Sequence, residues 1–517
     1  MKKLKLVCVA IAMACAAPSF AGGLLTNTNQ HVAFNRMMSR EASIGIDGVY
    51  YNPAGVVFMG DGHHLAINWQ LAYQTRTINN DYSLFTNNVN NPITPRDFKG
   101  KAFAPVIPSF QYAYNKGKWS FQANFALTGG GGKCTFDDGL GSFEKIVAET
   151  AIAACQLAGA VDQVAGAYNV PAIFSSNQCF GTEGKYSYNS YMHGRQYYYG
   201  LSAGAAYKFS DNFSAFLGVR GVYALTNYYG YVENIQVGQM PLYKVLNPAK
   251  ESSANIELSC DQSGVGFTPI IGVDYKTGRW NFSAKYEFKT RIRLKNKSVN
   301  QIPSIGNLPD NLRNAYIANG VPEAAADAIL SNPKIQGAMV ALKTQFDSKI
   351  DGAIGEYEDG KKIAGDIPAY LALGVGYSPV DAVRVNVGFH WFDDKNATSY
   401  NNRNKELKRG TLEYNAGVEV DVNKKITLST GWQNTNYGLS DEYMDDKSFV
   451  VSSNSVAIGG VYHINKKMDL NVAYFHTFYQ HKKTSEKVQL TAEKSINYSS
   501  DYTRNNNVFA VGLDINF

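Results

Sequence analysis

The last nine residues of the chain, Phe509–Phe517, read FAVGLDINF, and apolar residues occupy every second position of this stretch. A period of two is typical of a β-strand with one apolar face and one polar or small face. No later segment of the sequence follows to cover the apolar face. We therefore expect that face to contact lipid, which indicates a transmembrane β-barrel.

The same alternation recurs upstream. Segments with this period are 65–74, 119–127, 197–209, 280–288, 385–391 and 412–422. The chain has 34 Tyr, 27 Phe and 47 Gly, yet only 45% of its residues are hydrophobic. A barrel has such an average because lipid-facing apolar residues alternate with polar ones. The composition alone does not distinguish a barrel from a large secreted β-protein.

The connections predict the topology. Short turns are expected at 115–118, 210–212, 276–279, 378–382, 423–425 and 465–467. Long polar connections are expected at 79–102, 129–195, 230–262, 290–366, 393–410, 438–453 and 481–505. Short turns that alternate with long loops are typical of an outer-membrane barrel, and this pattern gives fourteen antiparallel strands. A barrel of that size has a lumen that is either open or plugged.

Two of the long connections are predicted to be partly helical. Phe143–Tyr168 and Pro322–Ile350 are rich in alanine and carry apolar residues three and four positions apart. Helices in such loops would cap the mouth of the barrel or offer an apolar landing surface.

The N-terminus indicates a secreted precursor. Three lysines precede an apolar run, Leu6–Ala17, and the small-x-small site Ser19–Ala21 follows. This pattern predicts a cleaved signal peptide over residues 1–21. A lipoprotein anchored through Cys15 is the weaker alternative. With a barrel to follow, the expected location is the outer membrane of a Gram-negative cell.

Charge and cysteine content add little. The formal net charge of +6 falls when the signal-peptide lysines leave, so we expect no nucleic-acid partner. The mature chain keeps Cys134, Cys155, Cys179 and Cys260, which allow three pairings in an oxidising compartment. We predict a Cys134–Cys179 disulfide that closes one long loop. Free or differently paired thiols are the alternative.

The segment 22–62 is too long for a lead-in to the first strand and too rich in glycine for a strand, so we interpret it as a plug. It contains VAFNRMMSREA at 32–42 and IDGVYYNPAG at 46–55. These motifs resemble the N-terminal hatch of the long-chain fatty-acid transporter family of outer-membrane proteins, the FadL/TodX type. The matching positions are Arg36, Ser39, Glu41, Asp47, Asn52, Pro53 and Ala54. The resemblance implies a hatch over 22–62 and a fourteen-stranded barrel over 63–517.

The resemblance also implies a function, the passive uptake of hydrophobic small molecules such as long-chain fatty acids or aromatic hydrocarbons. Ligand would land on the loops, enter an apolar pocket in the lumen and leave sideways into lipid at a kink in the third strand. The candidate residues for this opening are Asn124, Phe125, Ala126 and Gly129. Ala126 stands where the family has glycine, so the run Gly129–Gly132 would have to bend the strand instead.

Inward-facing side chains are candidate ligand contacts. Arg220 and Phe216 fall on one face of their strand, and a guanidinium in a lumen could anchor a ligand carboxylate. The alternative is a salt bridge from Arg220 to an inward carboxylate, Glu413 or Glu419. Lys285, Arg384 and His390 also fall inward and share that alternative.

No catalytic motif is present, so we expect no enzyme activity, cofactor or metal. Gly129–Lys133 is not a phosphate loop, because Cys134 stands where serine or threonine is needed. The acidic residues Asp441, Glu442, Asp445 and Asp446 suit a solvated loop better than a cation site. We expect a monomer that contacts outer-membrane lipid and is recognised by the barrel assembly machinery through Phe517. A porin, or an adhesin that uses the long loops, is the alternative function.

Overall fold

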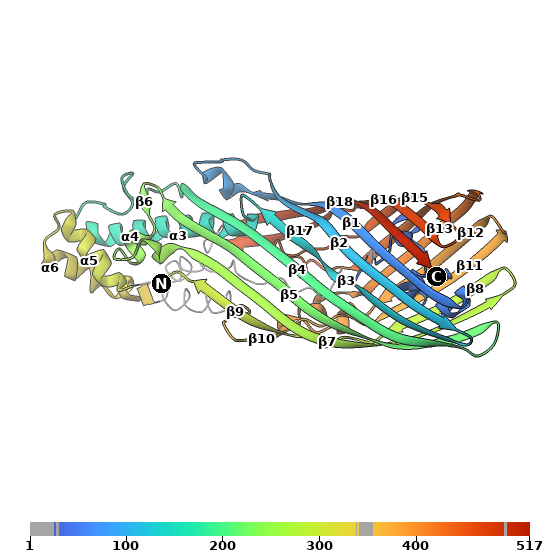
Figure 1. Cartoon of the computed structure of the whole chain (residues 1–517). Helices are drawn as coiled ribbons and strands as arrows, with labels where there is room; N and C mark the ends of the chain where they lie inside the picture. Colours follow the sequence, from blue (N-terminus) through green and yellow to red (C-terminus); the bar gives the residue numbers. More distant parts are fainter. Residues whose placement is uncertain (1–24, 27–29, 305, 338, 341–354, 491–493) are drawn as a thin grey trace.

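The structure is a computed structural model that describes residues 25–26, 30–304, 306–337, 339–340, 355–490 and 494–517. The predicted signal peptide lies outside these residues, as do 22–24 of the predicted hatch and most of 338–350 in the second predicted helical loop. A closed antiparallel β-barrel forms one end of the molecule, and helices gather at the other end (Figure 1).

The barrel consists of fourteen spans, as the sequence predicts. Eleven are continuous strands: β1 (Gly62–Tyr82), β2 (Arg96–Lys116), β3 (Trp119–Phe136), β4 (Tyr186–Lys208), β5 (Phe213–Val237), β7 (Ile256–Thr277), β12 (Val383–Phe392), β13 (Arg409–Asn423), β14 (Ile426–Gly438), β15 (Ser453–Asn465) and β18 (Ser495–Asn516). Three are interrupted: β8 (Trp280–Glu287) with β9 (Arg293–Gln301), β10 (Lys362–Ala364) with β11 (Tyr370–Val380), and β16 (Met468–Tyr479) with β17 (Lys482–Gln489). A two-residue strand, β6 (Met240–Pro241), extends β5 in the loops.

The first and last strands close the barrel. β1 pairs with β2 on one side and with β18 on the other. At the end of this seam the Phe517 amide donates to the His63 carbonyl at 2.9 Å, and the His63 amide donates to the Phe517 carbonyl at 2.7 Å. The C-terminal residue therefore takes part in the ladder.

The two faces of the strands differ as the alternation predicts. On β1, Ile67 and Trp69 are exposed on the outer surface, whereas Asn68 and Gln70 are buried in the lumen. Exposed apolar side chains recur on the outer face of the other strands, for example Leu217 on β5 and Ile458 on β15. An apolar outer band with a polar interior is the arrangement that a lipid bilayer stabilises.

All six short turns lie where the sequence predicts them, at the end of the barrel that we call the turn end. Several long connections are shorter than predicted. The first spans 83–95 rather than 79–102, and β17 and β18 form a hairpin within the predicted connection 481–505. The reason is that apolar alternation marks only the part of a strand that faces lipid. About 9–11 residues cross a bilayer, whereas β1 has 21 residues and continues beyond the apolar band.

The opposite end, called the loop end, carries the helices. They are α3 (Gly141–Gly166), α4 (Tyr243–Leu246), α5 (Leu308–Ala318) and α6 (Glu323–Leu330), with the 3₁₀ turns η2 (Ser83–Asn87), η3 (Glu251–Ala254), η4 (Asp394–Asn396) and η5 (Tyr400–Glu406). Their apolar faces share one core, in which Phe143 of α3 and Leu312 of α5 are buried. Both predicted helical loops are thus helical where described. No helix within the described residues is long and apolar enough to span a membrane.

The cysteine prediction is wrong. Cys134, Cys155, Cys179 and Cys260 are buried free thiols. Cys134 faces inward from β3 beside Ala102 of β2, whereas Cys179 lies in the connection that covers α3. The Cys155 thiol donates to the carbonyl of Phe180 at 3.4 Å. The structure therefore contains no Cys134–Cys179 disulfide.

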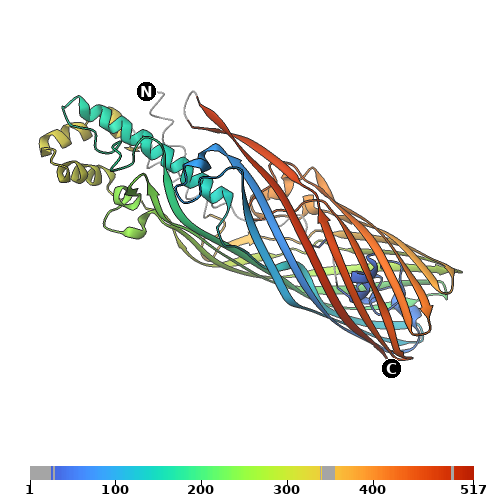
Figure 2. The same ribbon diagram turned by 90° about the horizontal axis from the view of Figure 1, so that it is seen from above.

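The segment ahead of β1 fills the barrel near its turn end (Figure 2). It forms α1 (Val32–Met37), α2 (Gly48–Tyr51) and the 3₁₀ turn η1 (Gly55–Met59). Almost every residue of 30–57 is buried. We call residues 30–61 the hatch.

Candidate functional site

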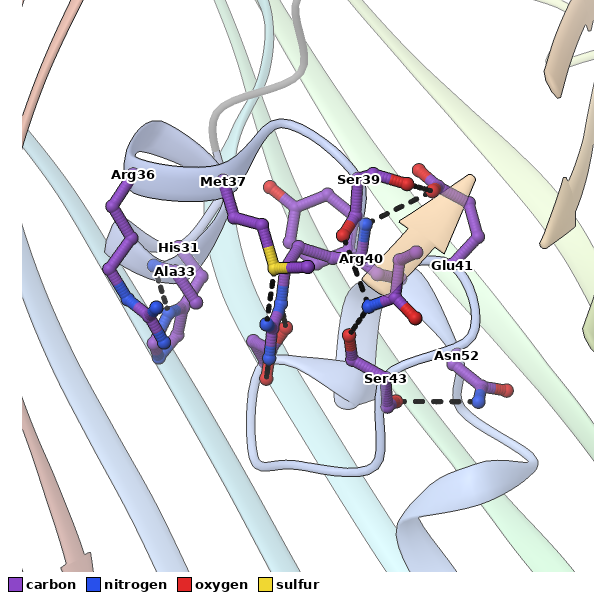
Figure 3. Close-up of polar contacts among 12 residues, drawn as sticks. His31, Ala33, Arg36, Met37, Ser39, Arg40, Glu41, Ser43 and Asn52 are labelled. Atoms are coloured by element: carbon purple, nitrogen blue, oxygen red, sulfur yellow. Dashed lines mark hydrogen bonds and ion pairs between the residues drawn. The ribbon is translucent and has the colours of Figure 1, made fainter. Parts of the chain in front are cut away.

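The hatch is held in the lumen by buried ion pairs to the wall, and hydrogen bonds within it, such as those from Ser39 and the Arg40 amide to Glu41, fix its turns (Figure 3). Glu419 of β13 accepts from Arg36 at 2.6 Å and from Arg40 at 3.0 Å. Arg40 also binds both oxygens of Asp47 at 2.7 and 3.0 Å, which closes the turn between α1 and α2. Burial by itself would raise the pKa of Asp47, but the charge of Arg40, its hydrogen bonds and the charge of Arg36 together hold this pKa below its usual range.

A second buried group joins the hatch to the next strand. Glu41 contacts Nε2 of His390 at 2.7 Å, and the other ring nitrogen contacts Glu413 at 2.8 Å. Glu41 also accepts from the Arg40 amide at 3.0 Å and from the Ser39 hydroxyl at 3.4 Å. The predicted residues Arg36, Ser39, Glu41 and Asp47 thus all belong to the contacts that dock the hatch.

The Asn52–Ala54 box bonds to strands on the opposite side of the barrel. Asn52 donates to Asp274 of β7 at 2.5 Å, and its side-chain oxygen accepts from the Gly55 amide at 3.2 Å. The carbonyls of Pro53 and Ala54 accept from Gln122 and Ser214, each at 2.7 Å. The tight turn therefore exposes its backbone carbonyls to β3 and β5.

Glycines on the inner wall make room for the hatch. The Met37 carbonyl lies so close to Gly417 of β13 and Gly431 of β14 that a Cβ atom at either position would overlap it. A Cβ atom at Gly374 or Gly388 would likewise overlap Glu41, and one at Gly459 would overlap Arg36. This run of glycines over β11–β15 is a docking surface for α1, because backbone can approach backbone closely only where Cβ atoms are absent.

Of the two roles considered for Arg220, the structure shows the salt bridge to an inward carboxylate, although the carboxylate is not one of the two named. Arg220 is fully buried and pairs with Glu287 of β8 at 2.6 Å, not with Glu413 or Glu419. Glu287 also accepts from Lys285 at 3.0 Å, and Lys285 donates to the Tyr50 carbonyl of the hatch at 2.7 Å. Phe216 packs against Ala54 and Val57 of η1 and its flank. Both candidates therefore lie against the hatch, Arg220 over the ring of Tyr50 and Phe216 beside Ala54 and Val57.

A break in the wall lies between β2 and β3. From the turn end the two strands are paired as far as Ser109 of β2 and Ala126 of β3. Pairing resumes nearer the loop end at Ala102 and Cys134, and the residues between these two pairs are unpaired with each other. The register of β3 with β4 also shifts on either side of Gly129. Gly130 and Gly132 have φ values of 94° and 75°, which side chains other than glycine rarely adopt. We call this unpaired stretch, 103–108 and 127–133, the β2–β3 gap.

Of the predicted strand-3 residues, Asn124, Phe125 and Ala126 lie at the edge of this gap nearer the turn end, and Gly129 lies within it. Ala126 is the last residue of β3 in register with β2 before the gap, and Asn124 accepts from Gln111 in the lumen at 3.0 Å. The bend comes from Gly129–Gly132 and not from position 126. Alanine at 126 is thus compatible with an interrupted wall.

A cavity of about 410 Å³ opens at the gap. Its lining includes Phe103 and Val106, which are exposed on the outer face of β2, and Phe475 and Val508, which are buried in the lumen. The same cavity therefore reaches both the outer apolar band and the interior of the barrel.

An apolar cluster lines the lumen on the loop side of the hatch. Tyr198, Val222, Ile292, Leu294 and Phe392 belong to it and are buried. Leu25, from the segment that precedes the hatch, packs into this cluster. Apolar side chains facing a barrel interior depart from the polar lumen usual in porins.

The acidic loop has internal partners. Asp446 accepts from the Ser142 amide at 2.8 Å and from the Tyr502 hydroxyl at 2.9 Å, and Asp445 pairs with Arg403 at 3.3 Å. Burial raises the pKa of Asp446. No cluster of His, Cys, Asp or Glu side chains suited to a metal ion occurs in the part of the chain that the structure covers.

Sequence reasoning missed the partners of the hatch. Arg40 stands inside the quoted motif but was not singled out, and Asp274 and Glu287 come from two distant strands. Glu419 was predicted to face inward, but as a partner of Arg220 and not of the hatch. The alternation along each strand does place these residues on the inner face. It places many other residues there as well, and the path of the hatch decides which of them it contacts.

Comparison with known proteins identifies the fold. The structure of a Pseudomonas aeruginosa FadL homologue matches with a TM-score of 0.58 and 13% identity over 96% of this chain and 100% of that chain. A deletion mutant of the monoaromatic hydrocarbon channel TodX, a protein of Pseudomonas putida, matches with a TM-score of 0.52 and 14% identity over 94% and 98%. No protein-family model and no curated protein matches the sequence. At such identities the likeness establishes the fold, a plugged fourteen-stranded barrel.

Proposed function

We propose that the protein is an outer-membrane channel for the passive uptake of hydrophobic small molecules, such as long-chain fatty acids or aromatic hydrocarbons. The observation that carries the proposal is the combination of a blocked lumen with a break in the wall. The hatch obstructs the direct path to the turn end, while the cavity at the β2–β3 gap reaches both lumen and lipid-facing surface.

Sideways release has a physical reason. An apolar ligand gains about 0.8 kcal/mol per CH₂ group by entering lipid rather than water. The apolar cluster around Leu25 offers a binding site for the ligand in the lumen. A ligand that displaced Leu25 would replace one apolar contact with another. The likeness to the FadL homologue and TodX folds supports this reading. The protein would act as a monomer without covalent chemistry, and Phe517 would be recognised by the assembly machinery.

The decisive experiment closes the gap with a reversible bond. A Cβ atom at Gly132 would lie 3.6 Å from the Cβ of Ala104 across the gap, within the range of about 3.5–4.5 Å found in disulfides. We expect Ala104→Cys with Gly132→Cys, in a Cys134→Ala background, to form this bond on oxidation. Cells would then lose uptake of labelled fatty acid and toluene, and a reductant would restore it.

The single variants Ala104→Cys and Gly132→Cys in the same background are the controls, the first for oxidation itself and the second for a side chain at a backbone position that favours glycine. Uptake that persists in the oxidised double variant, with the disulfide verified by mass spectrometry, would overturn release through this gap. Conductance in planar bilayers distinguishes the alternatives. A porin would conduct ions steadily whether or not the bond is formed, and an adhesin would leave uptake unaffected in every variant.

A further inference from the structure

The outer face of one barrel span changes from apolar to cationic at a sharp boundary. Along β8 the outward residues Trp280, Phe282 and Phe288 are exposed and apolar. Beyond the interruption the outward positions are Arg291, Arg293, Lys295 and Lys297, all exposed, which we call the basic stripe. The alternate residues Ile292 and Leu294 are buried in the lumen cluster. The stripe therefore faces away from the lumen.

The stripe carries excess positive charge. Lys362 of β10 is in register with Lys295 and adds a fifth exposed cation (Figure 1). Three carboxylates are near: Asp366 pairs with Arg293 at 2.8 Å, Asp261 is in register with Lys297, and Asp359 accepts from the Ser298 amide at 2.8 Å. Within the described residues, no carboxylate lies within ion-pair distance of Arg291, Lys295, Lys297 or Lys362.

A second group of cations lies on β2, β3 and β4 at the same transition. Lys101 is two positions before the exposed Phe103 on β2, Lys133 is the last residue of the gap on β3, and Arg195 is two positions before Tyr197 on β4. Lys133 and Arg195 are in register with each other. The ladder continues from Arg195 through Asn227 and Asp261 to Lys297, so both groups border the same apolar band.

We propose that the basic stripe binds the phosphate groups of the anionic glycolipid that forms the outer leaflet, lipopolysaccharide. Lipid headgroup phosphates lie just outside the hydrocarbon layer, the level at which the outward residues of β8–β9 change from aromatic to cationic. Lysine and arginine at that level keep their stems along the apolar surface and direct their charges to the phosphates. Several unpaired cations in a row match a bisphosphorylated headgroup better than the single carboxylate of a fatty acid. The inference rests on the outer-membrane placement in the proposed function.

The test compares two variants with the same change in charge. The first is Arg291→Gln, Lys295→Gln, Lys297→Gln and Lys362→Gln, with Arg293 left in place because it pairs with buried Asp366. The control is Lys424→Gln, Lys425→Gln, Lys466→Gln and Lys467→Gln in two turns at the opposite end of the barrel. Binding of purified bisphosphorylated lipid A to each detergent-solubilised barrel is measured by native mass spectrometry, with dephosphorylated lipid A in parallel.

We expect the parent and the control to bind bisphosphorylated lipid A equally, and the stripe variant to bind it on the order of tenfold more weakly or worse. Dephosphorylated lipid A should not distinguish the three proteins. Equal binding by stripe variant and parent, or equal loss in the control, would overturn the proposal. If a fatty acid competes with lipid A on the parent, the stripe is a carboxylate site instead, which also overturns it. A negative result for lipid A binding would not change the interpretation of the uptake experiment, because that experiment measures ligand release through the β2–β3 gap.

Discussion

At the scale of single residues, one carboxylate holds two arginines of the hatch. Glu419 is the partner of both Arg36 and Arg40, and all three are buried. Removal of one member of a buried ion pair costs up to about 3–5 kcal/mol, because the remaining charge is left without compensation. The hatch is a short segment, so a loss of this size is large relative to its docking energy.

We predict that Glu419→Gln loosens the hatch while the barrel stays folded. Hydrogen exchange of the amides of 32–41 should become faster, and brief openings should appear in single-channel recordings. Asp327→Asn is the control, since Asp327 lies on α6 at the loop end and pairs there with Arg313. The same exchange rate in both variants would count against an anchoring role for Glu419.

A second residue prediction concerns the glycine surface. In Gly431→Ala the new methyl group would overlap the Met37 carbonyl, so α1 has to move away from β14. We expect faster hydrogen exchange in α1 and a higher conductance than in the parent. In Gly221→Ala the nearest atom would be 3.6 Å from the new methyl group, so this control should behave as the parent. An unchanged conductance and exchange rate in Gly431→Ala would refute the requirement for glycine.

At the scale of elements, the loops pack around buried polar groups as well as apolar ones. Glu356 lies in the connection before β10, where the Asn296 side chain donates to its carbonyl at 2.5 Å. Burial raises the pKa of its carboxyl group from 4.5 to about 8. The folded state therefore holds the proton more tightly than the unfolded chain, and local stability falls as pH rises from 4.5 to about 8.

We predict that the amides of 355–361 become less protected between pH 6 and pH 8.5, after correction for the intrinsic exchange rate. Glu356→Gln should remove this difference, because its side chain does not ionise. The exposed neighbour Glu358 offers the control Glu358→Gln. Loss of protection that persists in Glu356→Gln would assign the pH dependence to another group.

At the scale of the whole molecule, strand ladders and hatch contacts are separate sources of stability. Each barrel strand is bonded to a neighbour on both sides, and the seam between β1 and β18 runs over most of their length. The hatch adds contacts inside this closed wall. We therefore expect the barrel to persist without it.

We predict that replacing 30–59 with a short Gly-Ser linker gives a folded barrel with a large, steady conductance. Boiled and unboiled samples should still migrate differently on a detergent gel, which verifies that the barrel is intact. Equal conductance with and without the hatch, in protein that passes this check, would mean that loops or wall side chains obstruct the lumen.

The sequence by itself determined the barrel. Lipid imposes one rule on every span, an apolar residue at each second position, so Phe509–Phe517 can be interpreted without knowledge of its partners. Five of the six turns lie beside such a segment, and the sixth, 465–467, was predicted from its polar residues. The strand ends at the loop side did not follow, since no lipid contact constrains the outward residues there.

Only the tertiary structure decided the internal partners and the opening. Arg220 pairs with Glu287, 67 positions away, because β5 and β8 both pair with β7 and their inward side chains meet in the lumen. The β2–β3 gap likewise depends on two strands losing register together, which Ala126 or Gly129 alone does not indicate. Alternation is a local property, because contact with lipid constrains each strand separately. Contacts between side chains in the lumen depend instead on where segments distant in the sequence meet.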